Sequence, residues 1–442
     1  MPTNKTLPLR AGTAKRDITP PIGTPLSGFI ARLEPSTGIA DRLHTRAVVL
    51  DDSRSVIVIV QMDLLGLGKW HVDEIRRLCW SNWQVPPERV MISTTHTHSG
   101  PGVVPLRGCE VTSLGYQWLL IDRTMQAIEE AYERRSEASI AIGREKFHLG
   151  INRRQNTPNG VVLGIAPDKP APDGVDVVCI RMADATAILF SHAVHPYCLG
   201  GESTLISGDI PSLACELLES QNVVALFVNG CAGNIAPEGA FQGIDVARQQ
   251  GTRLAAAVKT AISQSLEATD WKLSGASEHV YLPYASLPTK AKLDAMLAEE
   301  ERVVRPEERT NSSVQQKISI AQKDWAEHLS KILDRELPLD PVFCEVQTIA
   351  IGDFALVGVG GEPFFEIGQQ IAASSQYRHT WTLGYCNSYC GYLPTRAEFP
   401  YGGYEVNDSY RYLDTWQLES GCEERVIACA QRTLARALAG QA

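Results

Sequence analysis

The segment RVMISTTHTHSGPG, residues 89–102, decides how the whole chain is interpreted. Its first half, Arg89 to Thr95, is rich in β-branched and apolar residues and predicts a buried strand. Its second half is a glycine-rich turn with His96 and His98 two residues apart, on the same side of an extended chain. Because α/β sheets place their chemistry at strand ends and neutral imidazole is the commonest metal ligand, the segment predicts a metal-binding corner. Taken alone, such a pair also fits ordinary core or surface histidines.

Two other predicted strands end in the same way. The run from Ala187 to Val194 ends at His195, where a side chain can enter a cleft, whereas His192 lies inside the strand and is expected to pack in the core. A third run ends in two glycines before Glu362, which could equally be a favourable charge in a helix first turn. Two histidines and a glutamate are a common ligand set of hydrolytic zinc sites that keep an open position for water.

The alternation of strand-like and helical patterns predicts the fold class. Strand-like runs cover residues 55–61, 89–95, 175–182, 187–194, 223–228, 346–359 and 380–384, and helical patterns cover 69–83, 114–134, 210–221, 246–266, 364–373 and 423–438. We therefore expect an α/β (mixed α+β) fold, with a large twisted mixed β-sheet core flanked by helices. A charged helical stretch from Lys290 to Arg335 with a break at Arg305-Pro306 predicts a helix hairpin. We expect a single catalytic domain over residues 1–442 with this hairpin as a helical insertion, or cap, at 286–338.

The amino-acid composition limits the partners that we expect the protein to bind and the cellular compartment in which we expect it. The chain carries 41 basic and 51 acidic residues, a net charge of −10, which disfavours nucleic acid and anionic membranes and favours a small-molecule substrate. We find no signal peptide and no apolar run long enough to span a membrane, so we expect a cytoplasmic protein without stable membrane association. The eleven irregularly spaced cysteines are expected to be buried free thiols, and the spacing of Cys386 and Cys390 is only a weak hint of metal or redox chemistry. The oligomeric state is not predicted.

Several motifs, in order along the chain, resemble the zinc-dependent catalytic domain of the neutral/alkaline non-lysosomal ceramidase family, in the form of a short bacterial-type member. The resemblance runs from A-G-T-A-K-R-D-I-T-P-P at 11–21 to about Glu405, and its most specific motif is T-H-T-H-S-G-P-G at 95–102. Further matches are Q-M-D-L-L-G at 61–66, G-I-N-R at 150–153, N-G-C-A-G-N at 229–234, G-E-P-F at 361–364 and N-S-Y-C-G-Y-L-P-T at 387–395.

The resemblance implies a ligand set and a mechanism. The family's positions for Zn²⁺ ligands fall on His96, His195, Glu362 and Tyr392. His98 matches a histidine near the zinc-bound water, Arg153 an arginine at the substrate carbonyl, and Tyr404 a second active-site tyrosine. By this analogy, a metal-activated water attacks a carbonyl that the metal polarises, His98 relays a proton, and Tyr404 and Arg153 stabilise the oxyanion.

Departures from the family pattern bear on the substrate. Asn234 and Ala236 stand where the family's ceramide-cleaving members carry Asp and Ser, and the C-terminal immunoglobulin-like domain of secreted ceramidases is not found. We therefore expect a zinc-dependent amidohydrolase that cleaves a C–N amide, lactam or ester bond of a soluble small molecule and does not act on long-chain ceramide. The alternatives are a non-hydrolytic zinc enzyme (lyase, isomerase or cyclase), a true neutral ceramidase and a catalytically silent binding protein.

Overall fold

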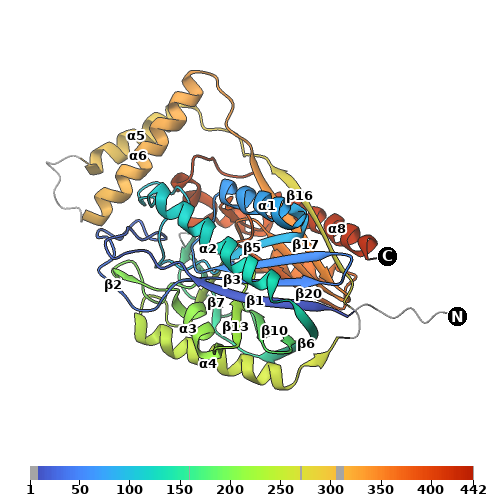
Figure 1. The fold of residues 1–442 in the computed structure, drawn as a ribbon. Coiled ribbons are helices and arrows are strands. Elements are labelled where there is room, and N and C mark those ends of the chain that lie inside the picture. Colours follow the sequence, from blue (N-terminus) through green and yellow to red (C-terminus); the bar gives the residue numbers. More distant parts are fainter. Residues whose placement is uncertain (1–7, 159, 269–270, 305–312, 442) are drawn as a thin grey trace.

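The computed structural model describes residues 8–158, 160–268, 271–304 and 313–441. In this part of the chain, two β-sheets pack face to face and helices cover their outer faces (Figure 1). The larger sheet has nine described strands in the order β13-β11-β10-β6-β1-β3-β4-β5, with β15 beside β6, and the smaller sheet has four in the order β16-β17-β18-β20. Both sheets are mixed, because β4 and β5, β11 and β13, and β18 and β20 are parallel while the other neighbours are antiparallel.

The elements have the following bounds. The strands of the larger sheet are β1 (Arg10–Asp17), β3 (His44–Asp51), β4 (Val56–Met62), β5 (Val90–Thr94), β6 (Ser136–Lys146), β10 (Gly174–Met182), β11 (Thr186–Ser191), β13 (Val223–Phe227) and β15 (Leu266–Glu267). Those of the smaller sheet are β16 (Leu273–Leu282), β17 (Val342–Ile351), β18 (Phe354–Val359) and β20 (His379–Leu383). The short strand pairs are β2 (Gly38–Ile39) with β12 (Leu205–Ile206), β7 (Gly150–Asn152) with β14 (Ile235–Pro237), β8 (Arg154–Thr157) with β9 (Gly160–Leu163), and β19 (Glu362–Pro363) with β21 (Tyr392–Leu393). The α-helices are α1 (Lys69–Trp83), α2 (Leu114–Glu133), α3 (Asp209–Leu218), α4 (Ile244–Ser263), α5 (Lys290–Val304), α6 (Ser313–Asp334), α7 (Phe365–Ala373) and α8 (Cys422–Gly440).

The alternation of side chains along the strands explains the layers. In β4, Val58 and Val60 pack in the core under α1 and α2, whereas Ile57 and Ile59 pack against the second sheet. The far half of the large sheet is covered by α3 and α4, and the outer face of the small sheet by α7 and α8. Strands between two apolar layers are buried on both faces, which is why the sequence of β4 reads as a continuous apolar run.

The predicted fold class is confirmed, with two differences in detail. Each predicted helix and strand region contains an element, but the run 346–359 falls in two strands, β17 and β18, joined by a turn in which Gly352 has φ +55°. The prediction also missed the second sheet as a separate layer. The strands β1, β3, β6 and β16 were not expected, because polar and charged residues interrupt their apolar patterns, as in the sequence SEASIAIGREK of β6.

The predicted helical insertion is present as α5 and α6, which lie against each other and project from the body (Figure 1). Trp325 of α6 is buried, stacks on Trp416 at 5.7 Å between ring centroids and donates a hydrogen bond to the Thr415 carbonyl. Lys317 donates to the Arg32 carbonyl at 2.6 Å. The predicted break at Arg305-Pro306 lies outside the described residues.

Two expectations from composition concern the whole chain. Within the described residues, no helix is both long and apolar enough to cross a membrane. All eleven cysteines lie in that part of the chain, and each is a free thiol, nine of them buried and Cys109 and Cys390 half-buried. The interpretation of the cysteines as mostly buried free thiols is therefore confirmed.

Candidate metal centre and active site

Strand ends from both sheets converge on one site. His96 comes two residues after β5, and His195 follows β11 in the larger sheet. Glu362 lies beyond β18 of the smaller sheet, where it begins the short strand β19. In the parallel pair of β19 and β21, Glu362 lies directly opposite Tyr392, so main-chain pairing brings these two side chains together.

The turn that carries His96 is strained and firmly anchored. His96 has φ +69°, an uncommon conformation for a residue other than glycine, and its N–H bonds to the Leu64 carbonyl at 2.9 Å. The next residue, Thr97, donates its hydroxyl hydrogen bond to the Ser207 carbonyl at 2.7 Å. Asp41 in turn accepts hydrogen bonds from the Ser207 hydroxyl and from the Gly208 N–H.

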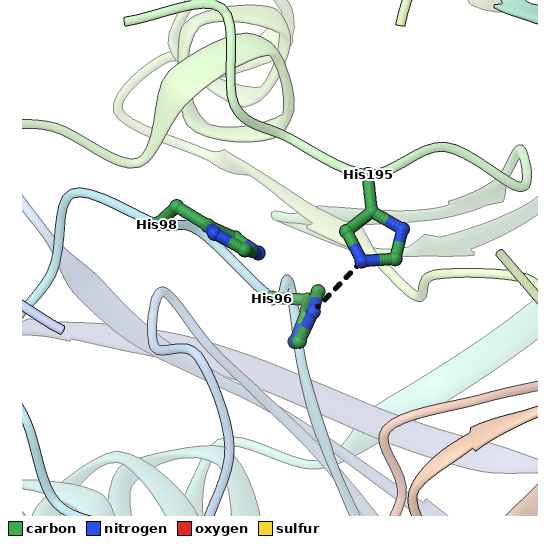
Figure 2. Close-up of side chains that lie close together, drawn as sticks. All are labelled: His96, His98 and His195. Carbon is green, nitrogen blue, oxygen red and sulfur yellow. Dashed lines mark hydrogen bonds between the residues drawn. The ribbon is translucent and has the colours of Figure 1, made fainter. Parts of the chain in front are cut away.

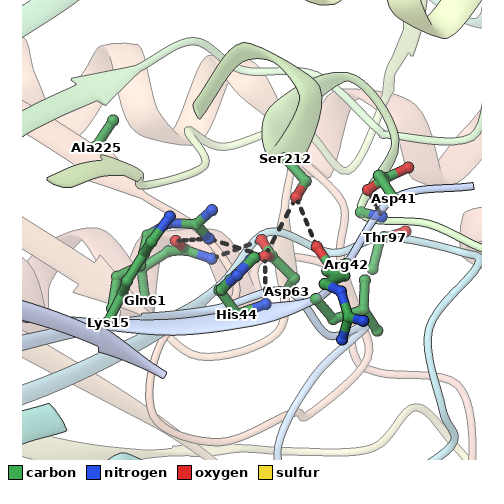
Figure 3. Close-up of polar contacts among 12 residues, drawn as sticks. Lys15, Asp41, Arg42, His44, Gln61, Asp63, Thr97, Ser212 and Ala225 are labelled. Carbon is green, nitrogen blue, oxygen red and sulfur yellow. Dashed lines mark hydrogen bonds and ion pairs between the residues drawn. The ribbon is translucent and has the colours of Figure 1, made fainter. Parts of the chain in front are cut away.

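A buried polar cluster lies beside Thr97 of this turn (Figure 3). Its centre is Asp63, which accepts hydrogen bonds from the Gln61 amide at 2.9 Å, the His44 N–H at 2.8 Å and the Ser212 hydroxyl at 3.4 Å. Asp63 also forms an ion pair with fully buried Arg46 at 2.8 Å. Buried charges are stable only when paired and hydrogen-bonded, and these contacts meet that condition while they link β3, β4 and α3.

The three histidine rings present the same nitrogen to the site. The Nδ1 atoms of His96, His195 and His98 lie 2.7, 2.6 and 3.0 Å from the carbonyl oxygens of Leu65, Ala232 and Gly28. Because only an N–H can donate to a carbonyl, each Nδ1 carries a proton, and in the neutral imidazole the lone pair then lies on Nε2. The rings of His96, His98 and His195 point toward one another, as Figure 2 shows.

Three donor atoms lie at mutual distances that suit a tetrahedral metal, and a fourth lies near one of them. Nε2 of His96 and Nε2 of His195 are 3.2 Å apart, and Glu362 Oε2 lies 3.1 and 3.0 Å from them. The Tyr392 hydroxyl oxygen lies 3.4 Å from Nε2 of His195. Metal–ligand bonds of about 2.0–2.1 Å place tetrahedral ligands roughly 3.3 Å apart. The set could therefore hold a divalent metal, which would also relieve the repulsion of the two facing lone pairs.

His98 stands beside these four donors. The ligand nitrogens of His96, His98 and His195 all lie within 4.8 Å of one another. The Nε2 atom of His98 is buried and has no hydrogen-bond partner among the described residues, and the same holds for Glu362 Oε2. Two such atoms in one place fit a bound cation and its water. By contrast, His192 is buried away from the site, with hydrogen bonds to Gly174 and Gly150, as expected of a core histidine.

Burial and charge set the ionisation of the site. Burial, together with the charge of Arg153, lowers the pKa of His195 to about 3. Burial and the neighbouring histidines hold the pKa of His98 well below its ordinary value. Burial acts to raise the pKa of Glu362, but His96 and His195 outweigh it and hold that pKa well below the ordinary range. Neutral imidazoles beside an ionised carboxylate are the forms that bind metals.

Arg153 and Tyr404 lie at the same end of the site. Arg153 donates a hydrogen bond to the Tyr392 oxygen at 3.0 Å and forms an ion pair with Glu405 at 2.9 Å. The Tyr404 ring meets the Tyr392 ring edge-on, with 5.8 Å between centroids. The structure thus brings together all seven residues that the sequence indicated.

Sequence reasoning missed two neighbours of these residues. Glu405 also pairs with buried Arg154, and the Tyr389 hydroxyl donates to Glu362 Oε1 at 2.6 Å. Tyr389 lies inside the motif at 387–395, and Glu405 directly follows Tyr404. The spacing of residues in the sequence, however, does not indicate which of these side chains touch.

The site opens into a cavity of about 630 Å³. Its wall is largely apolar, including Phe29, Ile30, Leu106, Ile165 and Leu413. Three charged residues on the wall have ion-pair partners: Arg107 with Asp414, Arg153 with Glu405, and Glu238 with Arg253. The fourth, Glu362, faces His96 and His195.

The two departures from the family pattern have different surroundings. Ala236 lines the cavity. Asn234 instead bonds the start of α7, since its amide donates to Glu366 at 2.8 Å and its oxygen accepts from the Phe365 N–H at 2.8 Å. Of the two substitutions, Ala236 is the one on the cavity wall.

An apolar cavity that ends at converging His, Glu and Tyr side chains could hold a metal ion, as the pockets of many hydrolases do. The sequence model of the neutral/alkaline non-lysosomal ceramidases, N-terminal region, matches residues 9–241, and the chain belongs to that family. The family assignment from the motifs is therefore confirmed, and it supports a hydrolase.

A curated relative agrees with this assignment, and two solved structures share the fold. The chain is similar to the neutral ceramidase of Pseudomonas aeruginosa, with 25% identity over 462 aligned positions that cover 90% of this chain and 68% of the relative. The crystal structure of neutral ceramidase from Pseudomonas aeruginosa superimposes with a TM-score of 0.72 at 20% identity, covering 98% of this chain and 75% of that one. A ceramidase complexed with C2 gives a TM-score of 0.71 with the same identity and coverage. The two superpositions support the fold.

Proposed function

We propose that this chain is a zinc-dependent hydrolase of a C–N amide bond, with lactams and esters as related substrates. The observation that carries the proposal is the group of four donor atoms, from His96, His195, Glu362 and Tyr392, at the end of the cavity. A zinc ion held by these residues would lower the pKa of a water at the site to near neutrality and would polarise a carbonyl.

The remaining side chains of the site have distinct proposed roles. His98, whose Nε2 is buried and unpartnered in the described structure, accepts and relays the proton. Its Nδ1 bond to Gly28 fixes the ring for this role. Tyr404 and Arg153 stabilise the negative charge on the carbonyl oxygen, and Arg153 is held in place by Glu405. A histidine relay predicts that His98→Ala changes the pH dependence of kcat/KM more than the zinc content.

The cavity supports a small uncharged substrate with an apolar group. Away from Glu362, its charged wall residues Arg107, Arg153 and Glu238 are already ion-paired, and its volume of about 630 Å³ suits a drug-sized ligand. Ala236 offers a methyl group where a serine would offer a hydroxyl. We therefore propose a soluble amide in preference to long-chain ceramide.

Long-chain ceramide is the second candidate substrate. It is favoured by the names of the relatives and by Leu163, Ile165 and Phe241, which line the cavity yet are 52%, 64% and 63% exposed. Exposed apolar side chains at a cavity mouth suit a long hydrocarbon chain.

One activity panel separates the two candidates. Zinc-loaded protein is assayed on N-acyl amino acids, lactams, lactones, short-chain ceramides and long-chain ceramide, with chelator-treated protein as the control. The proposal expects zinc-dependent turnover that is highest for a soluble amide, and Ala236→Ser should shift the preference toward ceramide. Equal turnover of long-chain ceramide and the best soluble amide by the wild type would favour a true ceramidase.

The same reaction in ¹⁸O-water tests for hydrolysis. Hydrolysis places one label in the acid product, whereas a lyase, isomerase or cyclase on this scaffold gives product without label. A substrate that turns over without taking up ¹⁸O would refute the hydrolytic assignment.

The proposal includes a cytoplasmic location, supported by eleven cysteines that are all free thiols. When the isolated protein is denatured and titrated with a thiol reagent, all eleven cysteines should be found reduced. Disulfides in protein isolated under non-reducing conditions, with free thiols blocked at lysis, would argue for an oxidising compartment instead.

A further inference from the structure

The candidate ligands are fixed in place by different means. The rings of His96 and His195 are held by main-chain carbonyls, those of Leu65 and Ala232. Glu362 is held by a side chain, because its Oε1 accepts a hydrogen bond from the Tyr389 hydroxyl at 2.6 Å. Its other oxygen, Oε2, is the one that lies 3.0–3.1 Å from the two histidine nitrogens.

We propose that Tyr389 is a positioning residue that orients the Glu362 carboxylate for metal binding, an inference that rests on the proposed metal site. A hydroxyl that donates to a carboxylate makes a short, charge-assisted hydrogen bond, stronger than one between neutral groups. With Oε1 engaged in this way, rotation of the carboxylate is restrained and Oε2 stays directed at the histidines. Hydrogen-bond partners of metal ligands typically contribute about 10–100-fold to metal affinity.

The Tyr389 ring is itself fixed by the segment that holds His96. A Cβ atom at Gly66 would lie 3.1 Å from Cδ2 of the Tyr389 ring, so the ring packs directly on the backbone at Gly66. The preceding residue, Leu65, supplies the carbonyl that bonds His96 Nδ1. One short segment therefore sets both the imidazole of His96 and the phenol that directs Glu362.

The loop that carries Tyr389 is anchored on the other side as well. The Asn387 N–H donates to the Ile92 carbonyl at 2.7 Å, and the Asn387 side-chain oxygen accepts from the Ile92 N–H at 3.1 Å. Asn387 has φ +60°, a conformation that asparagine tolerates better than most residues. These bonds tie the loop to β5 of the larger sheet, and the Asn387 amide donates to Gln347 of β17 in the smaller sheet at 2.9 Å. The loop that carries Tyr389 is therefore held to both sheets.

The test measures zinc affinity rather than activity. Apoprotein is prepared with a chelator, and zinc Kd is measured by competition with a chromophoric chelator for the wild type and for Tyr389→Phe. We expect Tyr389→Phe to bind zinc about 10–100-fold more weakly. The matched control is Tyr412→Phe, because Tyr412 lines the same cavity but its hydroxyl lies toward Gln322 of α6, and its Kd should equal that of the wild type.

Thermal unfolding in excess chelator separates positioning from folding. Tyr389→Phe apoprotein should unfold close to the wild-type temperature, so that its weaker zinc binding reflects the metal site. If Tyr389→Phe does not fold, Gly66→Ala decides, since it displaces the ring by a few tenths of an ångström and should weaken zinc binding in the same direction.

A zinc Kd of folded Tyr389→Phe within twofold of the wild type would overturn the role of Tyr389 while leaving the metal site standing. If Tyr389→Phe does not fold, a wild-type zinc Kd in Gly66→Ala would likewise overturn the role of Tyr389. A wild-type protein that binds no zinc would overturn the proposed function and this inference together.

Discussion

Tyr392 and Tyr404 are neighbours in the cavity, but their contacts differ. The Tyr392 oxygen lies 3.4 Å from His195 Nε2 and accepts a hydrogen bond from Arg153, whereas Tyr404 meets the site through its ring contact with Tyr392. We predict that Tyr392→Phe weakens zinc binding, because it removes a donor atom. Tyr404→Phe should keep its zinc and lose roughly 10²–10³ in kcat, as loss of one oxyanion donor typically does.

Zinc content beside kcat for the two variants checks this assignment. Loss of zinc from Tyr404→Phe with retention in Tyr392→Phe would mean that the two tyrosines have exchanged roles.

Glu405 joins two buried arginines at the edge of the site. It pairs with Arg153 at 2.9 Å and with Arg154 at 2.6 Å, and all three side chains are at most 5% exposed. Glu405→Ala would leave both guanidinium groups buried with one partner fewer, so we predict a loss of about 3–5 kcal/mol in the free energy of unfolding. Urea denaturation measures this loss.

The control for Glu405 is an exposed ion pair. Glu424 pairs with Arg396 while both are more than half exposed, and Glu424→Ala should cost less than about 1 kcal/mol. Equal stability of Glu405→Ala and Glu424→Ala would show that the buried pairs contribute no more than a surface pair.

At the scale of elements, the start of α3 supports the histidine turn through Asp41. Burial raises the pKa of Asp41 to about 7, and the charges of Glu216 and Asp63 add to this effect. Because the pKa in the folded state is raised, the stability that this group contributes is full below its ordinary value of 3.8 and is lost as the pH rises through about 7. Asp41→Asn should therefore become more stable relative to the wild type as the pH rises from 4 to 8.

The asparagine oxygen can still accept from the Gly208 N–H, and its amide NH2 can donate to the Ser207 oxygen, which reverses the direction of that bond. The reversal affects stability equally at every pH, so the pH dependence of the difference reports the charge. Urea unfolding of both proteins at several pH values measures the difference. If the free energies of unfolding of the two proteins changed with pH in parallel from pH 4 to 8, the raised pKa of Asp41 would be contradicted.

How well a strand can be predicted from its sequence depends on how fully the strand is buried. The run VIVIVQM of β4 is buried on both faces and was predicted to within one residue at each end. In β1, with the sequence RAGTAKRD, charged residues leave too little apolar pattern, although it pairs with β3 along its whole length. Local pattern cannot predict such a strand, because its place is set by neighbours distant in sequence.

At the scale of the whole molecule, the site is assembled from segments that the sequence keeps far apart. His96 and His195 could be proposed from strand ends alone, but Tyr392 entered only through the family resemblance. The pairing of Glu362 with Tyr392 across β19 and β21 explains why they meet, and no local spacing contains that pairing. Tyr389 was missed for the same reason, since its partner Glu362 is reached through the fold.

The metal content of the purified protein tests the central claim most directly. Elemental analysis after growth with zinc should find about one zinc per chain in the wild type and in His328→Ala, a control histidine that is 46% exposed on α6. His195→Ala and Glu362→Ala should each lose most of the zinc while remaining folded by circular dichroism. Wild-type zinc in both variants, or none in the wild type, would contradict the assignment of this site as a zinc centre.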